Sequence, residues 1–222
     1  MEVLYIDNHL LALNKPAGLV TQPSDTHPDS LECQAKAWIK AEFNKPGNVF
    51  LHAVHRLDRP VSGVVLFART SKALSRLNTS VRARELRKTY LAVVHGQAAE
   101  SATLTHYLAH RRLRAEVLSP KAQGAKEARL SYRRLAKNSE FSLLEIDLHT
   151  GRYHQIRVQL SAIGHPIVGD HKYGSALRSP QIALQHRTLL FPHPTTRQEI
   201  AISAPPRRGQ PWAKFSMLLE LD

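Results

Sequence analysis

The sequence predicts a single α+β domain, built on a mixed, mostly antiparallel sheet that is flanked by helices and loops. Three observations predict it. Strand-like segments outnumber helical ones. The helical segments are interspersed among the strands, without the strict alternation that is typical of a doubly wound sheet. No Pro-, Gly- or Ser-rich linker divides the 222 residues, so we expect one domain over residues 1–222.

Short apolar runs bounded by turn residues predict the strands. The runs at 3–6 and 10–13 enclose three polar residues, 7–9, which is a hairpin pattern. The uninterrupted apolar run at 64–68 predicts a buried strand. Further strands are expected at 89–95, 128–135, 141–148, 184–191 and 200–203.

Apolar spacing and capping residues predict the helices. Asp29 and Glu32 form a capping pair, and the segment that begins near Ser71 has one apolar face, formed by Ala73, Leu74, Leu77 and Val81. Four helices are expected: one from the capping pair through Ala41, one from Ser71, one at 154–163 and an amphipathic one at 212–221.

The chain is strongly basic. It carries 31 Lys and Arg against 18 Asp and Glu, so its net charge is +13, which favours polyanions such as RNA, DNA or an anionic membrane. No apolar run approaches the roughly 18 residues of a spanning helix, and the N-terminus lacks the basic start of a secretory signal. Cys33 is the only cysteine, so we expect no intrachain disulfide and a cytoplasmic location.

The positive charge is concentrated in residues 82–137. This segment holds 13 Lys and Arg against 4 Asp and Glu, and its densest run is Arg111-Arg112-Leu113-Arg114. A run of charge is usually a solvated face, but concentration on one segment favours a polyanion-binding surface.

Residues 52–63 (His-Ala-Val-His-Arg-Leu-Asp-Arg-Pro-Val-Ser-Gly) form the first candidate for chemistry. Asp58 lies between two arginines in a tight loop before a buried strand, and nearby positive charge keeps a carboxylate ionised. One alternative is a surface aspartate with a local salt bridge. Another is a metal site made by His52, His55 and Asp58, which are ligand types for zinc or manganese.

Residues 149–160 form the second candidate, a glycine turn that leads into a helix. Arg152, Gln155 and Gln159 are expected near one face, with Ile156 and Leu160 marking the buried face. Arg157 is expected at the edge of the core, where an arginine needs an anion, either a carboxylate or a phosphate. The alternative is a structural salt bridge to Asp147 or Glu145.

The third candidate is Arg87-Lys88-Thr89-Tyr90 at the start of a strand. Cations beside an aromatic ring suit a nucleic acid, since the cations bind phosphate and the ring stacks on an unpaired base. An ordinary strand tyrosine is the alternative.

Four motifs in this order resemble the RluA family of RNA pseudouridine synthases, in particular its stand-alone type without an S4 domain. The resemblance runs from Val3 to about Pro206. Its motifs are Asn-Lys-Pro-Ala-Gly at 14–18, His-Arg-Leu-Asp-Arg-Pro-Val-Ser-Gly at 55–63, Lys-Thr-Tyr at 88–90, and Gly-Arg-Tyr-His-Gln-Ile-Arg at 151–157 continued at 164–170. One departure is Val61, where the family usually has threonine.

The resemblance implies the pseudouridine synthase fold and an isomerase that needs no cofactor and no metal. It implies that Asp58 is the catalytic carboxylate, that Arg157 pairs with it and holds it ionised, and that Tyr90 stacks on the target base. Arg56 resembles the arginine that fills the space left by the departing base. The other expected RNA contacts are Lys88, Arg152, His154, Gln155, Arg111, Arg112 and Arg114.

The chemistry of such an isomerisation needs little machinery. Uracil leaves C1′ through N1, rotates and returns through C5, so one carboxylate suffices where a glycosidase needs two. Asp58 either attacks C1′ or removes the C2′ proton, and the sequence leaves both routes open.

The expected partner is a tRNA or rRNA stem-loop, bound by a monomer that has no separate N-terminal RNA-binding domain, because the first strand begins at Val3. Two rival classes stay open. One is a non-catalytic RNA-binding protein of the same fold, and the other is a metal-dependent hydrolase.

Overall fold

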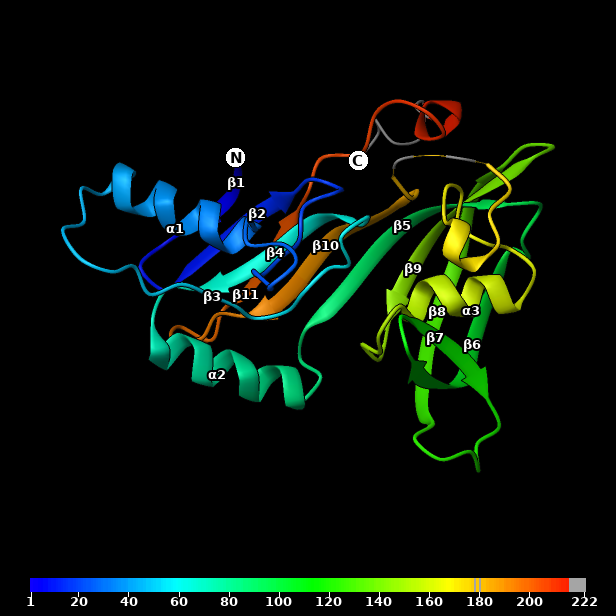
Figure 1. The fold of residues 1–222 in the computed structure, drawn as a ribbon, viewed down its shortest axis with the longest axis horizontal. Helices are drawn as coiled ribbons and strands as arrows, with labels where there is room; N and C mark the ends of the chain where they lie inside the picture. The colour runs from blue at the N-terminus through cyan, green and yellow to red at the C-terminus, as the bar shows by residue number, and fades with distance from the viewer. Residues whose placement is uncertain (178, 180, 216–222) are drawn as a thin grey trace. The chain divides into compact units, whose positions relative to one another are not determined.

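The computed structural model describes residues 1–177, 179 and 181–215. Contacts divide the chain into two compact units (Figure 1). Unit 1 combines Met1–Arg87 with His186–Ala204, and unit 2 combines Lys88–Gln185 with the described part of Pro205–Asp222. The expectation of a single domain therefore stays a prediction.

Unit 1 is built on a sheet whose neighbouring strands run in the order β1, β2, β4, β10, with β3 paired to β4 and β11 paired to β10. The predicted hairpin is confirmed, because β1 and β2 pair antiparallel around residues 7–9. Every residue of β4 is buried, as its apolar run predicts. The strands are β1 (Glu2–Ile6), β2 (Leu10–Lys15), β3 (His52–Ala53), β4 (Ser62–Ala68), β10 (Leu184–Pro192) and β11 (Glu199–Ser203).

Two predicted helices, α1 (Leu31–Glu42) and α2 (Ser71–Arg82), belong to unit 1. The expected capping pair is wrong for α1: Ser30 is the N-cap, and its hydroxyl accepts from the N–H of Cys33 at 3.2 Å. A serine hydroxyl at this position satisfies one of the open N–H groups of the first turn. In α2, Ala73 and Leu77 pack into the sheet core as the apolar spacing predicts.

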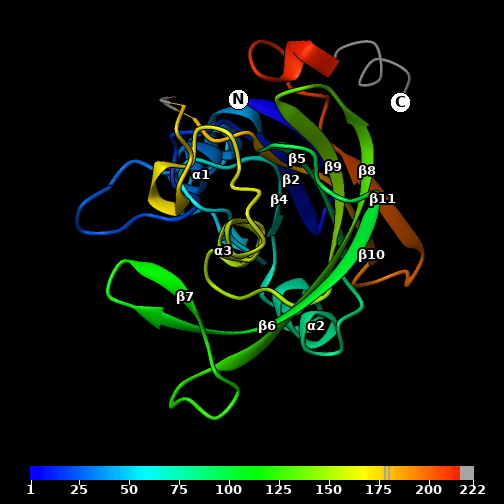
Figure 2. The same cartoon turned by 90° about the vertical axis from the view of Figure 1, so that its right-hand side faces the viewer.

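Unit 2 is built on antiparallel strands of the 11-stranded sheet, paired in the order β5, β9, β8, β6, β7. Figure 2 shows this sheet curving around α3. Strands β6 and β7 were not predicted, and they occupy the middle of the basic segment 82–137. The elements are β5 (Arg87–His95), β6 (Ser101–Arg111), β7 (Arg114–Leu118), β8 (Lys126–Lys137), β9 (Phe141–Leu148), α3 (Gln155–Ala162), and the short 3₁₀ helices η1 (His171–Tyr173) and η2 (Trp212–Phe215).

Helix α3 has the predicted place but not the predicted polar face. All residues from Gln155 to Leu160 are buried. Gln159 is fully buried, and its amide nitrogen donates to the carbonyls of Leu104 and Ala128. Backbone carbonyls therefore replace water for the amide nitrogens of Gln155 and Gln159.

The α+β prediction is confirmed. The predicted helix at 212–221 is a 3₁₀ turn at Trp212–Phe215, and its remainder lies outside the described residues. No helix in the described part of the chain has the length and apolar character needed to cross a membrane.

Candidate active site

The predicted site residues are divided between the units. Arg56 and Asp58 belong to unit 1, whereas Tyr90 and Arg157 belong to unit 2 together with all the other predicted RNA contacts. The expected pairing of Asp58 with Arg157 stays a prediction.

The loop that carries Asp58 connects β3 to β4 and is fastened to an earlier segment of unit 1. The Thr21 hydroxyl accepts from the N–H of Leu57 at 3.1 Å and lies 3.2 Å from the Leu57 carbonyl, to which it donates. The N–H of Gly18 donates to the Arg59 carbonyl at 2.7 Å. A further bond from the N–H of Val61 to the carbonyl of Asp58, at 3.0 Å, closes the tight turn. The carboxylate is therefore carried on a backbone that is held on both sides of it.

Lys15, at the end of β2, is the centre of this anchoring. Its side chain is fully buried, and its ammonium donates to the carbonyls of Pro16 at 2.9 Å, Leu19 at 2.6 Å and Arg59 at 3.2 Å. Burial lowers the pKa of the Lys15 ammonium to about 7, and the nearby Asp58 carboxylate opposes that shift. Lys15 thus ties the turn at 16–19 to the loop that carries Asp58 and brings a positive charge towards that carboxylate.

Gly63 and His55 fix the two ends of the loop. Gly63 has φ +112°, and a Cβ built there would lie 2.1 Å from the His186 carbonyl oxygen, so only glycine fits. Nε2 of His55 accepts from the N–H of Leu66 at 3.2 Å. Within residues 1–177, 179 and 181–215, no three His, Cys, Asp or Glu side chains are grouped so that they could hold a metal ion. The candidate set of His52, His55 and Asp58 is therefore not grouped in this way.

In unit 2, Tyr90 lies on β5 opposite Ile146 of β9. It is 6% exposed. Its neighbour Lys88 is half-buried, and burial lowers the pKa of the Lys88 ammonium.

Arg157 of α3 is 5% exposed and forms a two-pronged ion pair with the buried Asp170. Nε lies 2.7 Å from Oδ2 and Nη2 lies 2.9 Å from Oδ1. The structural partner suggested from the sequence, Asp147 or Glu145, is therefore wrong: Glu145 pairs with Arg133, and Asp147 accepts from Thr89.

His154 is the N-cap of α3 and has a left-handed backbone, with φ 51°. Burial, with the charge of Arg157, lowers the pKa of the His154 imidazole to about 3, so the ring is neutral at physiological pH. Its Nδ1 lies 2.8 Å from the Tyr173 hydroxyl, which accepts from the N–H of Ala115 at 2.8 Å. The Tyr173 hydroxyl therefore links the His154 ring to the backbone of β7.

The remaining predicted RNA contacts differ in exposure. Gln155 is buried, and its amide joins the Thr150 hydroxyl, the N–H of Arg152 and the Arg129 carbonyl, so it organises the glycine turn. The Arg152 side chain is exposed, and its Nε donates to the Glu127 carbonyl. The three arginines of the densest run are also exposed and lie around the turn between β6 and β7: Arg111, Arg112 and Arg114.

Sequence reasoning did not assign roles to Lys15, Thr21, Asp170 and Tyr173. Lys15 and Asp170 stood inside quoted motifs, so their motifs were a usable signal. Thr21 and Tyr173 each act through one hydroxyl group. The residues around them in the sequence do not distinguish them from other threonines and tyrosines of the chain.

A family model described as RNA pseudouridylate synthase matches residues 9–162. The chain belongs to this family. It is 34% identical over 220 residues to the ribosomal large subunit pseudouridine synthase D of Xanthomonas campestris, covering 92% of this chain but 66% of that protein. It is 32% identical over 226 residues to the tRNA pseudouridine synthase C of Haemophilus ducreyi, covering 92% and 90%. This chain thus spans just under two thirds of the first relative and most of the second.

Two solved structures of pseudouridylate synthase domains share the fold. Human RNA pseudouridylate synthase domain containing 4 has a TM-score of 0.80 at 21% identity, with 99% of this chain and 93% of that chain covered. The corresponding human domain containing 1 protein has a TM-score of 0.74 at 20% identity, with 100% and 95% covered. The predicted fold and family are confirmed.

Proposed function

We propose that the chain is an RNA pseudouridine synthase, an isomerase that converts selected uridines of tRNA or rRNA to pseudouridine with Asp58 as its catalytic carboxylate. The observation that carries this proposal is the anchoring of Asp58. Thr21 and Gly18 hold the backbone on both sides of it, and the Lys15 ammonium lies close enough to interact with its charge. A fixed, charged carboxylate suits attack on C1′ or removal of the C2′ proton.

The residues of unit 2 complete the proposed roles. Tyr90 stacks on the target base, and Arg157 pairs with Asp58 and keeps it ionised. Asp170 orients the guanidinium of Arg157 through two hydrogen bonds. The arginine side chain is therefore already ordered, and it loses little conformational entropy when it binds a further partner. Arg56, which is exposed, occupies the space that the base leaves in the RNA stack.

The substrate we propose is a stem-loop with the target uridine in the loop. One relative is named for ribosomal RNA and another for tRNA, so both RNA classes stay open for this chain. Exposed Arg111, Arg112, Arg114 and Arg152 supply the charge for phosphates, and Lys88 and His154 are the further RNA contacts of this proposal. The cytoplasmic location and the monomeric state stay predictions.

The test of this proposal is Asp58→Asn with matched Asp25→Asn as control. Asp25 is an exposed aspartate of the same unit. Asp58→Asn should lower turnover on a tRNA or rRNA stem-loop more than about a hundredfold while RNA affinity stays within a few-fold, because the phosphate contacts are intact. Asp25→Asn should leave both unchanged. Pseudouridine is counted after digestion of the RNA.

The same assay separates the rivals. A wild-type protein that binds the stem-loop and never forms pseudouridine would be a non-catalytic RNA-binding protein. Activity that is lost on dialysis against EDTA and returns only with zinc or manganese would favour the metal-dependent class. We expect full activity after that dialysis.

A further inference from the structure

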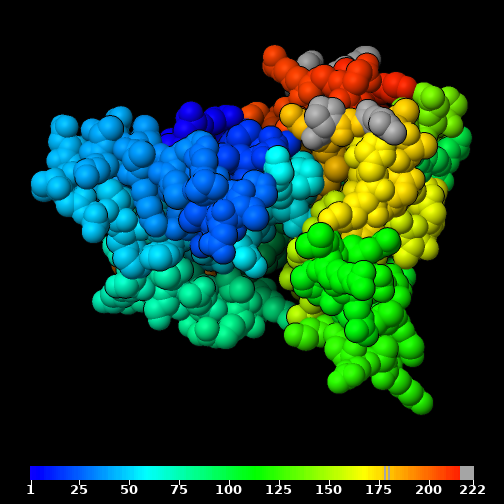
Figure 3. Space-filling view, in the orientation of Figure 1, coloured from blue at the N-terminus to red at the C-terminus, as the bar shows by residue number. Residues whose placement is uncertain are grey.

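A large apolar side chain lies exposed within the most basic part of the molecule. Leu113 stands in the turn between β6 and β7 and is 76% exposed. Arg112 precedes it and Arg114 follows it. Figure 3 shows the green segment that contains this hairpin at the lower right, on the surface of unit 2. A leucine contributes nothing to phosphate binding, so its exposure among cations calls for a different ligand group.

The turn that presents Leu113 is fastened to the rest of unit 2. The Leu113 carbonyl accepts from the Lys172 ammonium at 2.8 Å and from the Tyr153 hydroxyl at 3.4 Å. Two residues further on, the N–H of Ala115 donates to the buried Tyr173 hydroxyl at 2.8 Å. The backbone is therefore positioned before any ligand arrives, and little ordering entropy remains to be lost on binding.

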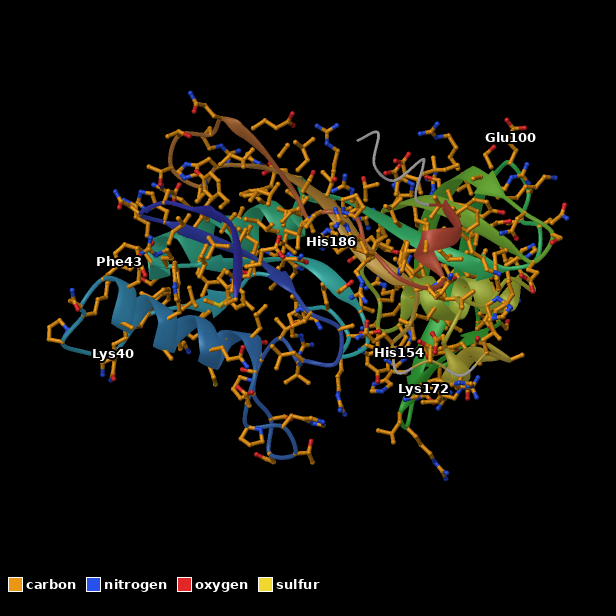
Figure 4. The ribbon with its side chains drawn as sticks, turned by 90° about the horizontal axis from the view of Figure 1, so that it is seen from above. Lys40, Phe43, Glu100, His154, Lys172 and His186 are labelled. Carbon is orange, nitrogen blue, oxygen red and sulfur yellow. The ribbon has the colours of Figure 1, made fainter. Side chains whose placement is uncertain are left out.

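Aromatic rings adjoin this turn. Tyr153 stacks on His154 with ring centroids 3.8 Å apart and planes 19° apart, and His110 packs against Tyr153 at 4.2 Å. Tyr153 is 43% exposed, and His110 is exposed on β6. Figure 4 labels His154 together with Lys172, whose positive charge is one of the causes that lower the pKa of the His154 imidazole.

Leu113, His110 and Tyr153 together form what we call the hairpin-tip surface, rimmed by Arg111, Arg112, Arg114 and Lys172. An apolar and aromatic surface with a cationic rim matches an unpaired nucleotide, because the base is apolar on its faces and its phosphates are anionic. The many cations favour an RNA over an uncharged or basic protein partner.

We propose that the hairpin-tip surface contacts an unpaired nucleobase of the substrate RNA, at a position other than the isomerised uridine. This inference rests on the proposed function for the identity of the RNA. The contact reads an unstacked base, and the surrounding arginines hold the flanking phosphates.

The test is a double-mutant cycle between protein and RNA. Leu113→Ala is compared with wild type for affinity on the stem-loop and on a set of the same RNAs with one abasic nucleotide at each loop position. We expect Leu113→Ala to weaken binding about five- to tenfold, in the range that the loss of one base contact gives. At one abasic position other than the target, the wild-type protein should lose about as much affinity as Leu113→Ala loses on the intact RNA. On that same abasic RNA, Leu113→Ala and wild type should bind equally.

Salt dependence gives an independent readout. The slope of log affinity against log salt should be the same for Leu113→Ala and wild type, since no phosphate contact is lost, whereas Arg112→Ala should flatten it by about one. The matched control is Val117→Ala, which truncates a 38% exposed apolar side chain on β7 of the same hairpin and should leave affinity unchanged.

Three results would overturn the inference: Leu113→Ala binds as wild type does, its loss is the same on every abasic RNA, or its salt slope falls as that of Arg112→Ala does. Affinity, not product, is the readout. A wild-type protein that binds through the hairpin-tip surface but forms no pseudouridine would therefore refute the proposed activity and leave this inference standing.

Discussion

Arg157 and Asp170 face each other inside unit 2 with two parallel hydrogen bonds of 2.7 and 2.9 Å. Both residues are almost completely buried, and the guanidinium also lies 5.0 Å from the ring centroid of Tyr173. Arg157 ends the first part of the last motif, 151–157, and Asp170 ends its continuation, 164–170, so this ion pair joins the two parts of one sequence motif. It makes the orientation of the proposed catalytic arginine depend on a second carboxylate.

Asp170→Asn should therefore destabilise the protein. Removing one partner of a buried pair leaves the other charge without compensation, which costs about 3–5 kcal/mol. Urea unfolding measures the loss. Asp147→Asn, which alters an exposed carboxylate on β9, should cost less than about 1 kcal/mol. Equal stability of the two variants would show that the ion pair contributes little.

Lys15 predicts opposite pH trends for activity and stability. The charged ammonium has three N–H groups for three carbonyls, and the neutral amine has two, so single-turnover rate should fall as pH rises through about 7. The pKa is lowered from its ordinary value of 10.5, so the unfolded chain binds more protons between these values. The free energy of unfolding should accordingly rise with pH from about 7 towards 10.5.

Lys15→Met is the matched control for this prediction, because methionine keeps the buried length without a titrating group. We expect it to react more slowly than wild type and to lose the alkaline fall in rate between about pH 6 and 8.5. A Lys15→Met variant with the same pH profile as wild type would assign the fall to another group.

Gly63→Ala should unfold or strongly destabilise unit 1. The residue has φ +112°, and its new methyl group would meet the His186 carbonyl at 2.1 Å, where a backbone atom has no room to move. We expect a loss of more than about 3 kcal/mol, since strain and overpacking add. Gly47→Ala has open space around it and should change stability little. Thermal unfolding of both variants checks the contrast.

Tyr90 and Tyr132 offer a comparison within one sheet. Both pair with Ile146, from β5 and β8 respectively, so they lie on the same face with 6% and 5% exposure. Tyr90→Ala should weaken RNA binding by about 1–3 kcal/mol through lost stacking, and Tyr90→Phe should bind nearly as wild type does. Tyr132→Ala should lower the unfolding midpoint without weakening RNA binding. The same pattern for both alanine variants would make Tyr90 a core residue only.

Much of the fold followed from local pattern. The buried strand β4 and the apolar face of α2 were predicted because their side chains all enter one core, so period and burial agree. The strands β6 and β7 were missed because they bury few apolar side chains: in β6 only Leu104, Leu108 and Ala109 are inside. A strand with so thin a buried face carries almost no alternation for sequence reasoning to detect.

The site was predicted less completely, for a different reason. Motifs gave Asp58, Tyr90 and Arg157 roles that stay predictions, whereas the pairing of Asp170 with Arg157 depends on two segments meeting in space. For Gln155 and Gln159 the predicted exposure was wrong. The sequence placed their amides on a polar face, whereas the structure buries both side chains, and their amide nitrogens donate to backbone carbonyls. Satisfaction of a buried amide depends on distant segments, so spacing along one helix does not reveal it.

Helix α3 is closed to solvent over six successive residues, Gln155–Leu160. In a library of single substitutions, most helices show tolerant positions at regular intervals where side chains reach water. This helix has no such interval, so substitution at any of the six should reduce the amount of folded protein. A map of tolerated substitutions over these six residues would then overstate how many of them take part in catalysis, because a variant that packs poorly and a variant that cannot react both lose activity. Only assays that normalise turnover to folded protein will separate Arg157 from its packed neighbours.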